Sequence, residues 1–237
     1  MIAIYPDTRL AERILDRPVW AALSTRQAHL CDKTGRACAF NRSVAQFAAT
    51  DPQAGPEVGD LARVATGRPE GLVLMQADRV RGGRGLEVVE TLAGVQMVAT
   101  GRFHSAEHPG IAALCPGDIP AILSLVALTK PGPFKRRTLE TGRYYGIKAN
   151  GHLIAVAGER MKLPGHTEIS AVCTHPSFRG RGLAGKLTQH VAQKIIERGE
   201  TPFLHTYASN TYAIALYESL GFELRQNMHI IRLVANP

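Results

Sequence analysis

The amino-acid sequence predicts an α/β protein of the α+β kind, in which helices pack on a mixed β-sheet. From residue 168 to residue 233, the pattern of apolar and polar residues reads strand, glycine-rich loop, helix, strand, helix, strand. Upstream, residues 144–157 read as two strands joined by Asn150-Gly151, the dipeptide favoured in two-residue hairpin turns. Apolar residues make up 45% of the 237 residues, which is enough to build a core under such a sheet.

The first strand of this series begins at Glu168 and leads, past Pro176, into an Arg-Gly-Arg-Gly loop at residues 179–182. Gly180 and Gly182 lack a Cβ atom, so the chain can turn tightly there and approach a ligand closely. The N–H groups that follow stand unpaired at a helix start, where the helix dipole also favours negative charge. These N–H groups belong to Arg181, Gly182, Leu183 and Ala184. The loop therefore predicts an anion site that suits a pyrophosphate.

The spacing of apolar residues, and the glycines at which helices end, predict the elements around this loop. Apolar residues at four-residue intervals, with polar residues as far as Arg198 on the other face, indicate a helix that starts at Leu183 and ends at Gly199. Its apolar stripe consists of Leu183, Leu187, Val191 and Ile195, widened by Ala184 and Ile196. The next strand, short helix and strand are expected at residues 201–207, 210–220 and 222–233. Upstream, Pro116-Gly117-Asp118 signals the start of another helix, which residues 131–134 break.

Two of these segments resemble the motifs of a known family. Residues 179–184 fit the pattern Arg/Gln-x-x-Gly-x-Gly/Ala of the acetyl-CoA pyrophosphate loop in the GNAT superfamily of N-acetyltransferases. Residues 210–222 fit its signature Asn-x-x-Ala-x-x-x-Tyr-x-x-x-Gly-Phe. The motifs occur in order, separated by one helix and one strand, which is far more specific than either motif alone. The resemblance covers roughly residues 118–233 and implies a GNAT-type acyltransferase fold in the C-terminal half.

The resemblance implies that an acetyl group passes from acetyl-CoA to a primary amine by direct attack. The amine, with a reference pKa of about 10.4, must lose a proton, and the departing thiolate gains one. By resemblance, Tyr217 is the general acid and Glu168 a candidate general base, with His205 in reserve. Tyr217 also fits a core aromatic residue, and Glu168 also fits a solvated charge at a strand edge.

The resemblance also assigns residues to acetyl-CoA. Main-chain groups around Val172 would receive the acetyl group and pantetheine and polarise the thioester carbonyl. Asn210 matches a residue that contacts CoA, and it equally fits a helix N-cap. The predicted cofactor-binding residues are Val172, Cys173, Thr174, Arg179, Gly180, Arg181, Gly182, Leu183, Ala184, Asn210 and Ala213.

The sequence does not identify the amine acceptor, which can be a small molecule or a peptide. The resemblance places its pocket at about residues 123–143 and 225–231. The pocket residues Phe134, Arg136 and Arg137, together with Tyr144, fit acidic, amino-acid-like or peptide amines.

The composition fits a cytoplasmic enzyme with a polyanionic co-substrate. The formal net charge of +8 could attract nucleic acid or a membrane, but it fits a protein that binds acetyl-CoA better, because Lys and Arg are dispersed. The only notable basic cluster is residues 135–137, which fits a solvated loop or a place near the acceptor or the CoA phosphates. The four cysteines show no Cys-x-x-Cys spacing, so no metal is expected. Neither a signal peptide nor a membrane span is expected.

The N-terminal half is less regular. We expect two domains: residues 1–115, an N-terminal α/β segment, and residues 116–237, a GNAT acetyltransferase domain. The first is either a degenerate copy of the same fold or a wall over the acceptor site. An Arg-Gly string at residues 81–85 has no helix after it, so we interpret it as a hairpin loop. Short helices are expected at residues 18–23 and 43–48, a loop at 51–56, and strands at 72–75, 86–89 and 95–98.

Two functions of other classes remain open at this stage. One is a catalytically silent regulatory protein that binds CoA. The other is a nucleic-acid-binding protein whose Arg-Gly loop contacts backbone phosphate, which would bind generic DNA with a steep salt dependence.

Overall fold

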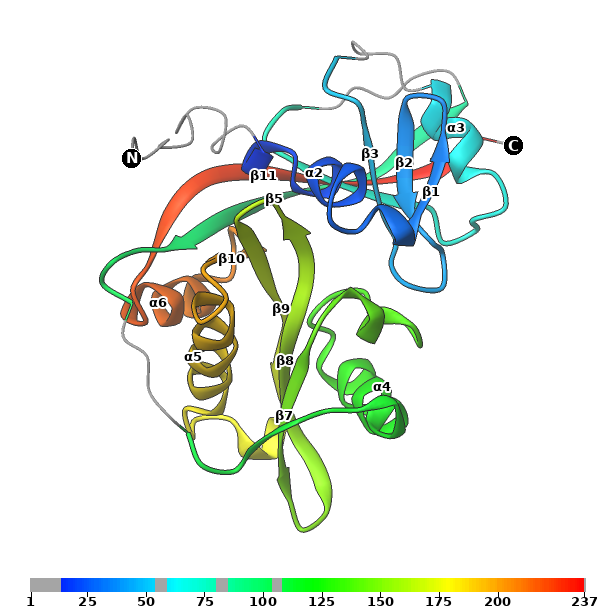
Figure 1. Ribbon diagram of the computed structural model, residues 1–237. Helices are drawn as coiled ribbons and strands as arrows, with labels where there is room; N and C mark the ends of the chain where they lie inside the picture. Colours follow the sequence, from blue (N-terminus) through cyan, green and yellow to red (C-terminus); the bar gives the residue numbers. More distant parts are fainter. Residues whose placement is uncertain (1–13, 54–58, 80–84, 104–107, 237) are drawn as a thin grey trace. The chain divides into compact units, whose positions relative to one another are not determined.

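The computed structural model describes residues 14–53, 59–79, 85–103 and 108–236 (Figure 1). The chain divides into two compact units. One contains residues 1–42, 46–94 and 226–237, and the other contains residues 43–45 and 95–225. These bounds differ from the domains expected from the sequence, residues 1–115 and 116–237, and that division stays a prediction.

The sheet of the second unit has the strand order β11-β5-β10-β9-β8-β7-β6. Its strands are β5 (Leu86–Ala99), β6 (Ile111–Ala113), β7 (Tyr144–Ala149), β8 (His152–Leu163), β9 (His166–Thr174), β10 (Thr201–Tyr207) and β11 (Phe222–Ala235). Strands β5 and β11 contribute residues to both units. Strands β9 and β10 pair in parallel, whereas β6, β7, β8 and β9 pair in antiparallel fashion, so the predicted mixed sheet is confirmed.

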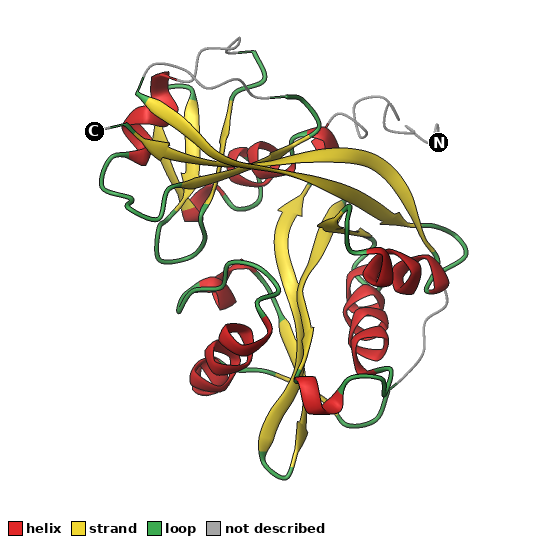
Figure 2. Cartoon of the chain, turned by 180° about the vertical axis from the view of Figure 1, so that it is seen from behind, coloured by secondary structure: helices red, strands yellow, loops and turns green. Residues whose placement is uncertain are grey.

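Helices cover both faces of strands β7 to β10 in this unit (Figures 1 and 2). On one face, α5 (Leu183–Ile196) and α6 (Thr211–Ser219) enclose a core that includes Ile169, Leu204 and Tyr145. On the other face, α4 (Ile119–Thr129) packs on Tyr144 and Val156. Neighbouring residues of a strand point to opposite faces, so Tyr144 and Tyr145 belong to different cores. The described residues of this unit also form the short 3₁₀ helices η2 (Pro116–Asp118), η3 (Thr138–Thr141) and η4 (Pro176–Phe178).

The predicted elements of this unit are confirmed with small differences. Strand β10 has the predicted bounds, helix α5 ends at Ile196 rather than at Arg198, and Asn150-Gly151 forms the hairpin turn with positive φ at both residues. Strand β9 begins at His166, two residues before the predicted start. Ile196 does not widen the stripe of α5, because it is 40% exposed at the last turn of the helix.

The first unit has the strand order β1-β2-β3-β4-β11-β5 over a core of small and aliphatic residues. Its remaining elements are α2 (Pro18–Ser24), η1 (Ala28–Leu30), β1 (Cys31–Thr34), β2 (Ala37–Phe40), β3 (Phe47–Thr50), α3 (Gly59–Ala65) and β4 (Leu72–Gln76). The helix predicted at residues 18–23 and the strand predicted at residues 72–75 are confirmed. The two strands predicted at residues 86–89 and 95–98 form one continuous strand, β5. No helix in the part of the chain that the structure describes is long and apolar enough to cross a membrane.

One prediction for this unit is wrong, and another falls mostly outside the described residues. Residues 43–48 do not form a helix, because Phe47, Ala48 and Ala49 lie in β3, buried between β2 and β4. Tertiary burial of small residues overrides their helix propensity there. Strands β4 and β5, which flank the predicted hairpin loop at residues 81–85, are not neighbours, because β11 lies between them in the sheet. Residues 80–84 themselves, like 54–58 in the expected loop at residues 51–56, lie outside the described residues.

Candidate active site

Strands β9 and β10 separate partway along their length. Their parallel pairing runs from His166 and Thr201 to Ile169 and Leu204, and both strands continue beyond it. Beyond Ile169 and Leu204, the facing backbone groups of the two strands are not paired with each other. Such an opening between parallel strands can admit an extended ligand.

A β-bulge lies on β9 at this opening. Ser170 pairs with Gly158 and Cys173 pairs with Val156, so two residues of β9 stand opposite one residue of β8. One of the two, Ala171, has a φ of 55°, a conformation that side chains other than glycine rarely adopt. Bulges and strained backbone concentrate at functional sites, where they redirect main-chain groups. The main chain from Val172 to Thr174, where the acetyl group and pantetheine are expected, follows the bulge directly.

The Thr174 hydroxyl fits a ligand in this opening. Thr174 is the last residue of β9, and its Oγ1 atom is buried with no hydrogen-bond partner among the described residues. A buried hydroxyl without a partner costs about 1–3 kcal/mol. A polar ligand group beside Thr174 would remove that cost.

The glycine-rich loop forms the predicted start of α5. Gly180 and Gly182 have φ values of 75° and 71°, and a Cβ atom on either would meet no atom within 4 Å. The first intrahelical bond runs from the Lys186 N–H to the Gly182 carbonyl at 3.1 Å, so the N–H groups before Lys186 have no helical partner. No acidic residue lies in the first turn of α5. The backbone therefore leaves an open, electropositive position.

Two arginines flank this position. Arg179 and Arg181 are exposed, and the guanidinium carbon of Arg181 lies 4.9 Å from the centre of the Phe178 ring. His175 follows the last residue of β9, and its Nδ1 atom accepts a hydrogen bond from the Ser177 N–H at 3.2 Å. The loop thus combines two exposed cationic side chains with several N–H groups that have no helical partner, a combination that can bind an anion.

Helix α6 carries the second motif. Asn210 caps it, since its Oδ1 atom accepts a hydrogen bond from the Ala213 N–H at 3.1 Å. Tyr217 is only 7% exposed, and its ring meets Phe222 edge-on at 6.2 Å. Burial raises the pKa of Tyr217 to about 12, so its hydroxyl stays protonated at neutral pH. This protonation state is the one that a general acid needs.

Glu168 is not a solvated charge, because its side chain is fully buried. Arg160 donates to it through Nε at 2.7 Å and through Nη2 at 2.5 Å, and the His205 Nδ1 atom lies 2.7 Å from Oε1. Burial by itself raises the pKa of Glu168, but the Arg160 charge and these hydrogen bonds lower it to about 2. Glu168 is therefore ionised at neutral pH and holds a proton poorly by itself.

His205 has a second partner on its other ring nitrogen. Its Nε2 atom lies 3.0 Å from the Gln96 Nε2 atom, and the Gln96 Oε1 atom accepts a hydrogen bond from Arg225 Nη1 at 2.9 Å. Burial lowers the pKa of His205, which favours the neutral imidazole. The sequence motifs pointed to Glu168 and His205 and placed Arg225 only in the acceptor region, whereas they gave no role to Arg160 or Gln96. A polar residue between Val95 and Met97 was the one signal available for Gln96.

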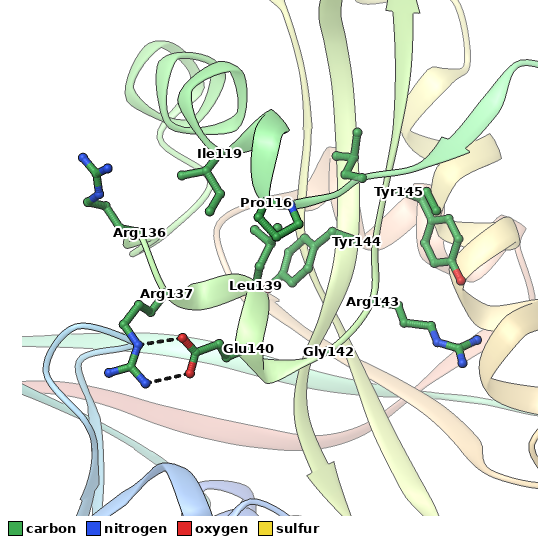
Figure 3. Close-up of a pocket in the computed structure, with 12 residues that line it drawn as sticks. Pro116, Ile119, Arg136, Arg137, Leu139, Glu140, Gly142, Arg143, Tyr144 and Tyr145 are labelled. Atoms are coloured by element: carbon green, nitrogen blue, oxygen red, sulfur yellow. Dashed lines mark hydrogen bonds and ion pairs between the residues drawn. The ribbon is translucent and has the colours of Figure 1, made fainter.

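A pocket of about 620 Å³ lies beside Tyr144 on the face that α4 covers (Figure 3). Its lining residues are Ala113, Leu114, Pro116, Ile119, Arg136, Arg137, Leu139, Glu140, Gly142, Arg143, Tyr144 and Tyr145. Arg137 forms a bidentate ion pair with Glu140, at 2.6 and 2.7 Å, while Arg136 lies above this pair and Arg143 to its right in Figure 3. The lining overlaps the predicted acceptor region at residues 136–143, and none of it comes from residues 225–231.

Known proteins resemble this chain in sequence and in structure. The family model described as FR47-like protein matches residues 144–231. The ribosomal protein bS18-alanine N-acetyltransferase of Salmonella typhimurium is 32% identical over 128 residues, 50% of this chain and 86% of that protein. The crystal structure of a protein assigned to the GNAT family of acetyltransferases, from Novosphingobium aromaticivorans, is 39% identical. It covers 94% of this chain and 99% of its own, with a TM-score of 0.88. A GCN5-related N-acetyltransferase from Kribbella flavida shares the fold at 18% identity, with a TM-score of 0.60 over 97% of this chain and 96% of its own.

Proposed function

The chain belongs to the GNAT family of N-acetyltransferases, and from this premise we propose that it transfers an acetyl group from acetyl-CoA to a primary amine by direct attack. The observation that best supports the proposal is the opening between β9 and β10 beside the glycine-rich start of α5. An extended thioester with a pyrophosphate at one end matches both features at once.

Acetyl-CoA supplies the activated acetyl thioester, and residues of this chain would hold it at two places. The N–H groups at the start of α5, with Arg179 and Arg181, would bind the pyrophosphate. The Thr174 hydroxyl would give its missing hydrogen bond to the pantetheine arm. Main-chain N–H groups redirected by the bulge near Val172 would polarise the thioester carbonyl.

The two proton transfers would involve groups on opposite faces of the sheet, His205 as the base and Tyr217 as the acid. The amine nitrogen forms a bond to the acetyl carbon, and the carbon–sulfur bond breaks. The amine gives its proton to the His205 Nε2 atom, while Glu168 holds the Nδ1–H group and stabilises the resulting imidazolium. Tyr217 gives a proton to the departing thiolate. Glu168 thus acts through His205, because a carboxyl with a pKa of about 2 is a weak base.

The acceptor that we propose is a peptide or amino-acid-like amine carrying an acidic group. The pocket beside Tyr144 combines an apolar floor with three arginines and one glutamate, which gives it a net positive charge. The Salmonella relative is named for an alanine of ribosomal protein bS18, so a protein α-amine is the first acceptor to try.

Thiol release from acetyl-CoA in the presence of a panel of amines tests this function. Peptides with acidic side chains near the α-amine should be acetylated faster than matched peptides with lysines, and Arg136→Glu should reduce that preference. Arg102→Glu, which makes the same charge change at an exposed position paired with Glu223, is the control. Binding of acetyl-CoA without turnover of any amine would instead support a silent CoA-binding protein.

A further inference from the structure

A continuous chain of five polar side chains crosses one face of the sheet in the second unit. Arg225 bonds to Gln96, Gln96 to His205, His205 to Glu168, and Glu168 to Arg160. These residues come from β11, β5, β10, β9 and β8, which are neighbours in that order. They lie on the face opposite α5, since the alternate residues of the same strands point into the core that α5 covers.

The chemistry of the two end groups fixes the direction of every hydrogen bond in this chain. A guanidinium group only donates, so the Gln96 Oε1 atom must face Arg225. The Gln96 NH₂ group therefore faces His205, and the His205 Nε2 atom must accept. The other ring nitrogen, Nδ1, then carries the proton and donates to the ionised Glu168. Donation runs in one direction from Arg225 to Glu168.

Gln96 and Glu168 act on His205 in opposite senses. A buried carboxylate beside Nδ1 favours the imidazolium, which would leave His205 with no lone pair for a substrate proton. A donor facing Nε2 disfavours the imidazolium, because two N–H groups would then point at each other. The charged groups around the ring are Glu168 from β9, Arg160 from β8 and Arg225 from β11, with the Tyr144 hydroxyl of β7 close to Arg160 and Glu168.

We propose that Gln96 and Arg225 are positioning residues that keep His205 neutral, with its Nε2 lone pair ready to accept the proton of the amine. Arg225 acts through Gln96 by preventing the amide from turning its oxygen toward the ring. An acceptor ammonium that takes the place of the Gln96 amide meets the same lone pair and passes its proton to it. The catalytic meaning of this inference rests on the proposed role of His205 as the base.

Titration of the His205 imidazole by NMR in the full-length protein, labelled with ¹⁵N-histidine, tests the inference without any activity. In the unaltered protein we expect the proton on Nδ1 and a pKa below that of an ordinary histidine. Gln96→Glu, which is nearly isosteric, replaces the donor with an acceptor and should raise the pKa of His205 by at least about one unit, a tenfold gain in proton affinity. Arg225→Met should raise it too, because the amide can then turn, and Arg225→Lys should restore it.

A double-variant cycle separates this role from the loss of a nearby positive charge. If Arg225 acts through the amide, Arg225→Met should have little further effect on the pKa of His205 once Gln96 is changed to Met. Equal shifts in both backgrounds would overturn the inference, as would an unchanged His205 titration in Gln96→Glu. Circular dichroism would confirm folding of each variant.

The pH profile of acetyl transfer distinguishes this inference from the proposed function. The acidic limb of kcat/KM should move to higher pH in Gln96→Glu by as much as the titration moves. A titration that moves while the profile stays fixed would leave the Gln96 effect intact and remove His205 as the base. A titration that stays fixed removes the Gln96 effect, whatever the activity.

Discussion

Around Glu168, strands β5, β10, β9 and β8 carry side chains of opposite chemistry on their two faces, whereas further along β8 and β9 the second face joins the apolar core under α4. On the face under α5, Val95, Met97, Ile169 and Leu204 form a continuous apolar core. On the other face, the alternate residues form the polar chain from Gln96 to Arg160. The first face needs only apolar side chains of about the right volume. The second needs a particular partner for each group, because a buried polar atom without one is costly.

The two faces therefore have different roles in the candidate site. The apolar face fixes α5 on the sheet and so holds the glycine-rich loop beside the end of β9. The polar face controls where protons reside, since Glu168 stays ionised and His205 is held neutral. Tyr217 belongs to the apolar face, where burial keeps its hydroxyl protonated. The proposed acid and the proposed base therefore lie on opposite faces of one sheet.

The largest effect on the rate is expected for Tyr217→Phe. Removing the hydroxyl takes away the proton for the thiolate and leaves the ring packed against Phe222. General acid–base steps contribute on the order of 10²–10⁴-fold, so kcat should fall within that range while acetyl-CoA affinity changes little. Single-turnover thiol release and calorimetric binding measure the two quantities. An unchanged kcat would make Tyr217 a core aromatic residue only.

Glu168→Leu should disrupt the hydrogen-bonded side chains of the polar face. The variant leaves the buried Arg160 guanidinium without its carboxylate, and removing one partner of a buried ion pair costs about 3–5 kcal/mol of stability. Urea denaturation measures the loss. On the apolar face, Ile169→Val is the control at the neighbouring position and should cost about 0.5–1.5 kcal/mol. Equal losses for the two variants would contradict the claim that the polar face depends on specific partners.

The two faces also differ in how well the sequence predicts them. The sequence predicts helix α5 because its apolar pattern repeats locally and ends at Gly199, and it predicts strand β10 as the apolar run that follows this glycine. The fully buried state of Glu168 was not predicted, because Arg160 and His205 approach it from other strands. Gln96 lies 109 residues from His205 in the chain, and no local pattern records such a contact. Distant contacts also explain why β3 was not predicted, because its residues are held in an extended conformation by pairing with β2 and β4.

The Glu168 environment also predicts a loss of stability in acid. The folded pKa of about 2 lies below the unfolded value of about 4.3, so this contribution is fully present above pH 4.3. It should be lost as the pH falls from about 4.3 to 2, and it amounts to about 3 kcal/mol. Denaturation at a series of pH values measures it against Glu168→Gln, which lacks the carboxyl. The same slope in both proteins would show that other carboxyls cause the loss.

Gly182→Asp tests whether the glycine-rich loop at the start of α5 binds the pyrophosphate. A carboxylate at this position would repel the pyrophosphate, so the variant should lose the thermal stabilisation that acetyl-CoA gives the unaltered protein. That stabilisation is about 2.7 kcal/mol at a hundred times the dissociation constant. Gly199→Asp is the matched control: its φ of 74° imposes the same strain beyond the other end of α5, far from the loop along the helix. A folded Gly182→Asp protein with the full shift would refute the phosphate-loop assignment.

The smallest effect, expected at Asn210, separates a structural role from a binding role. Asn210 caps α6 through Ala213, so Asn210→Ala should cost about 1 kcal/mol of stability, as the loss of an N-cap does. Asn210→Asp keeps a capping oxygen and should restore most of that stability. If Asn210 also contacts CoA, as its motif implies, the aspartate should still weaken acetyl-CoA binding, because it replaces an amide with a negative charge near a polyanion. Denaturation and calorimetric titration of both variants measure the two effects. Full acetyl-CoA affinity in Asn210→Asp would leave Asn210 as a cap alone, and it would confine cofactor recognition to the loop before α5 and the end of β9.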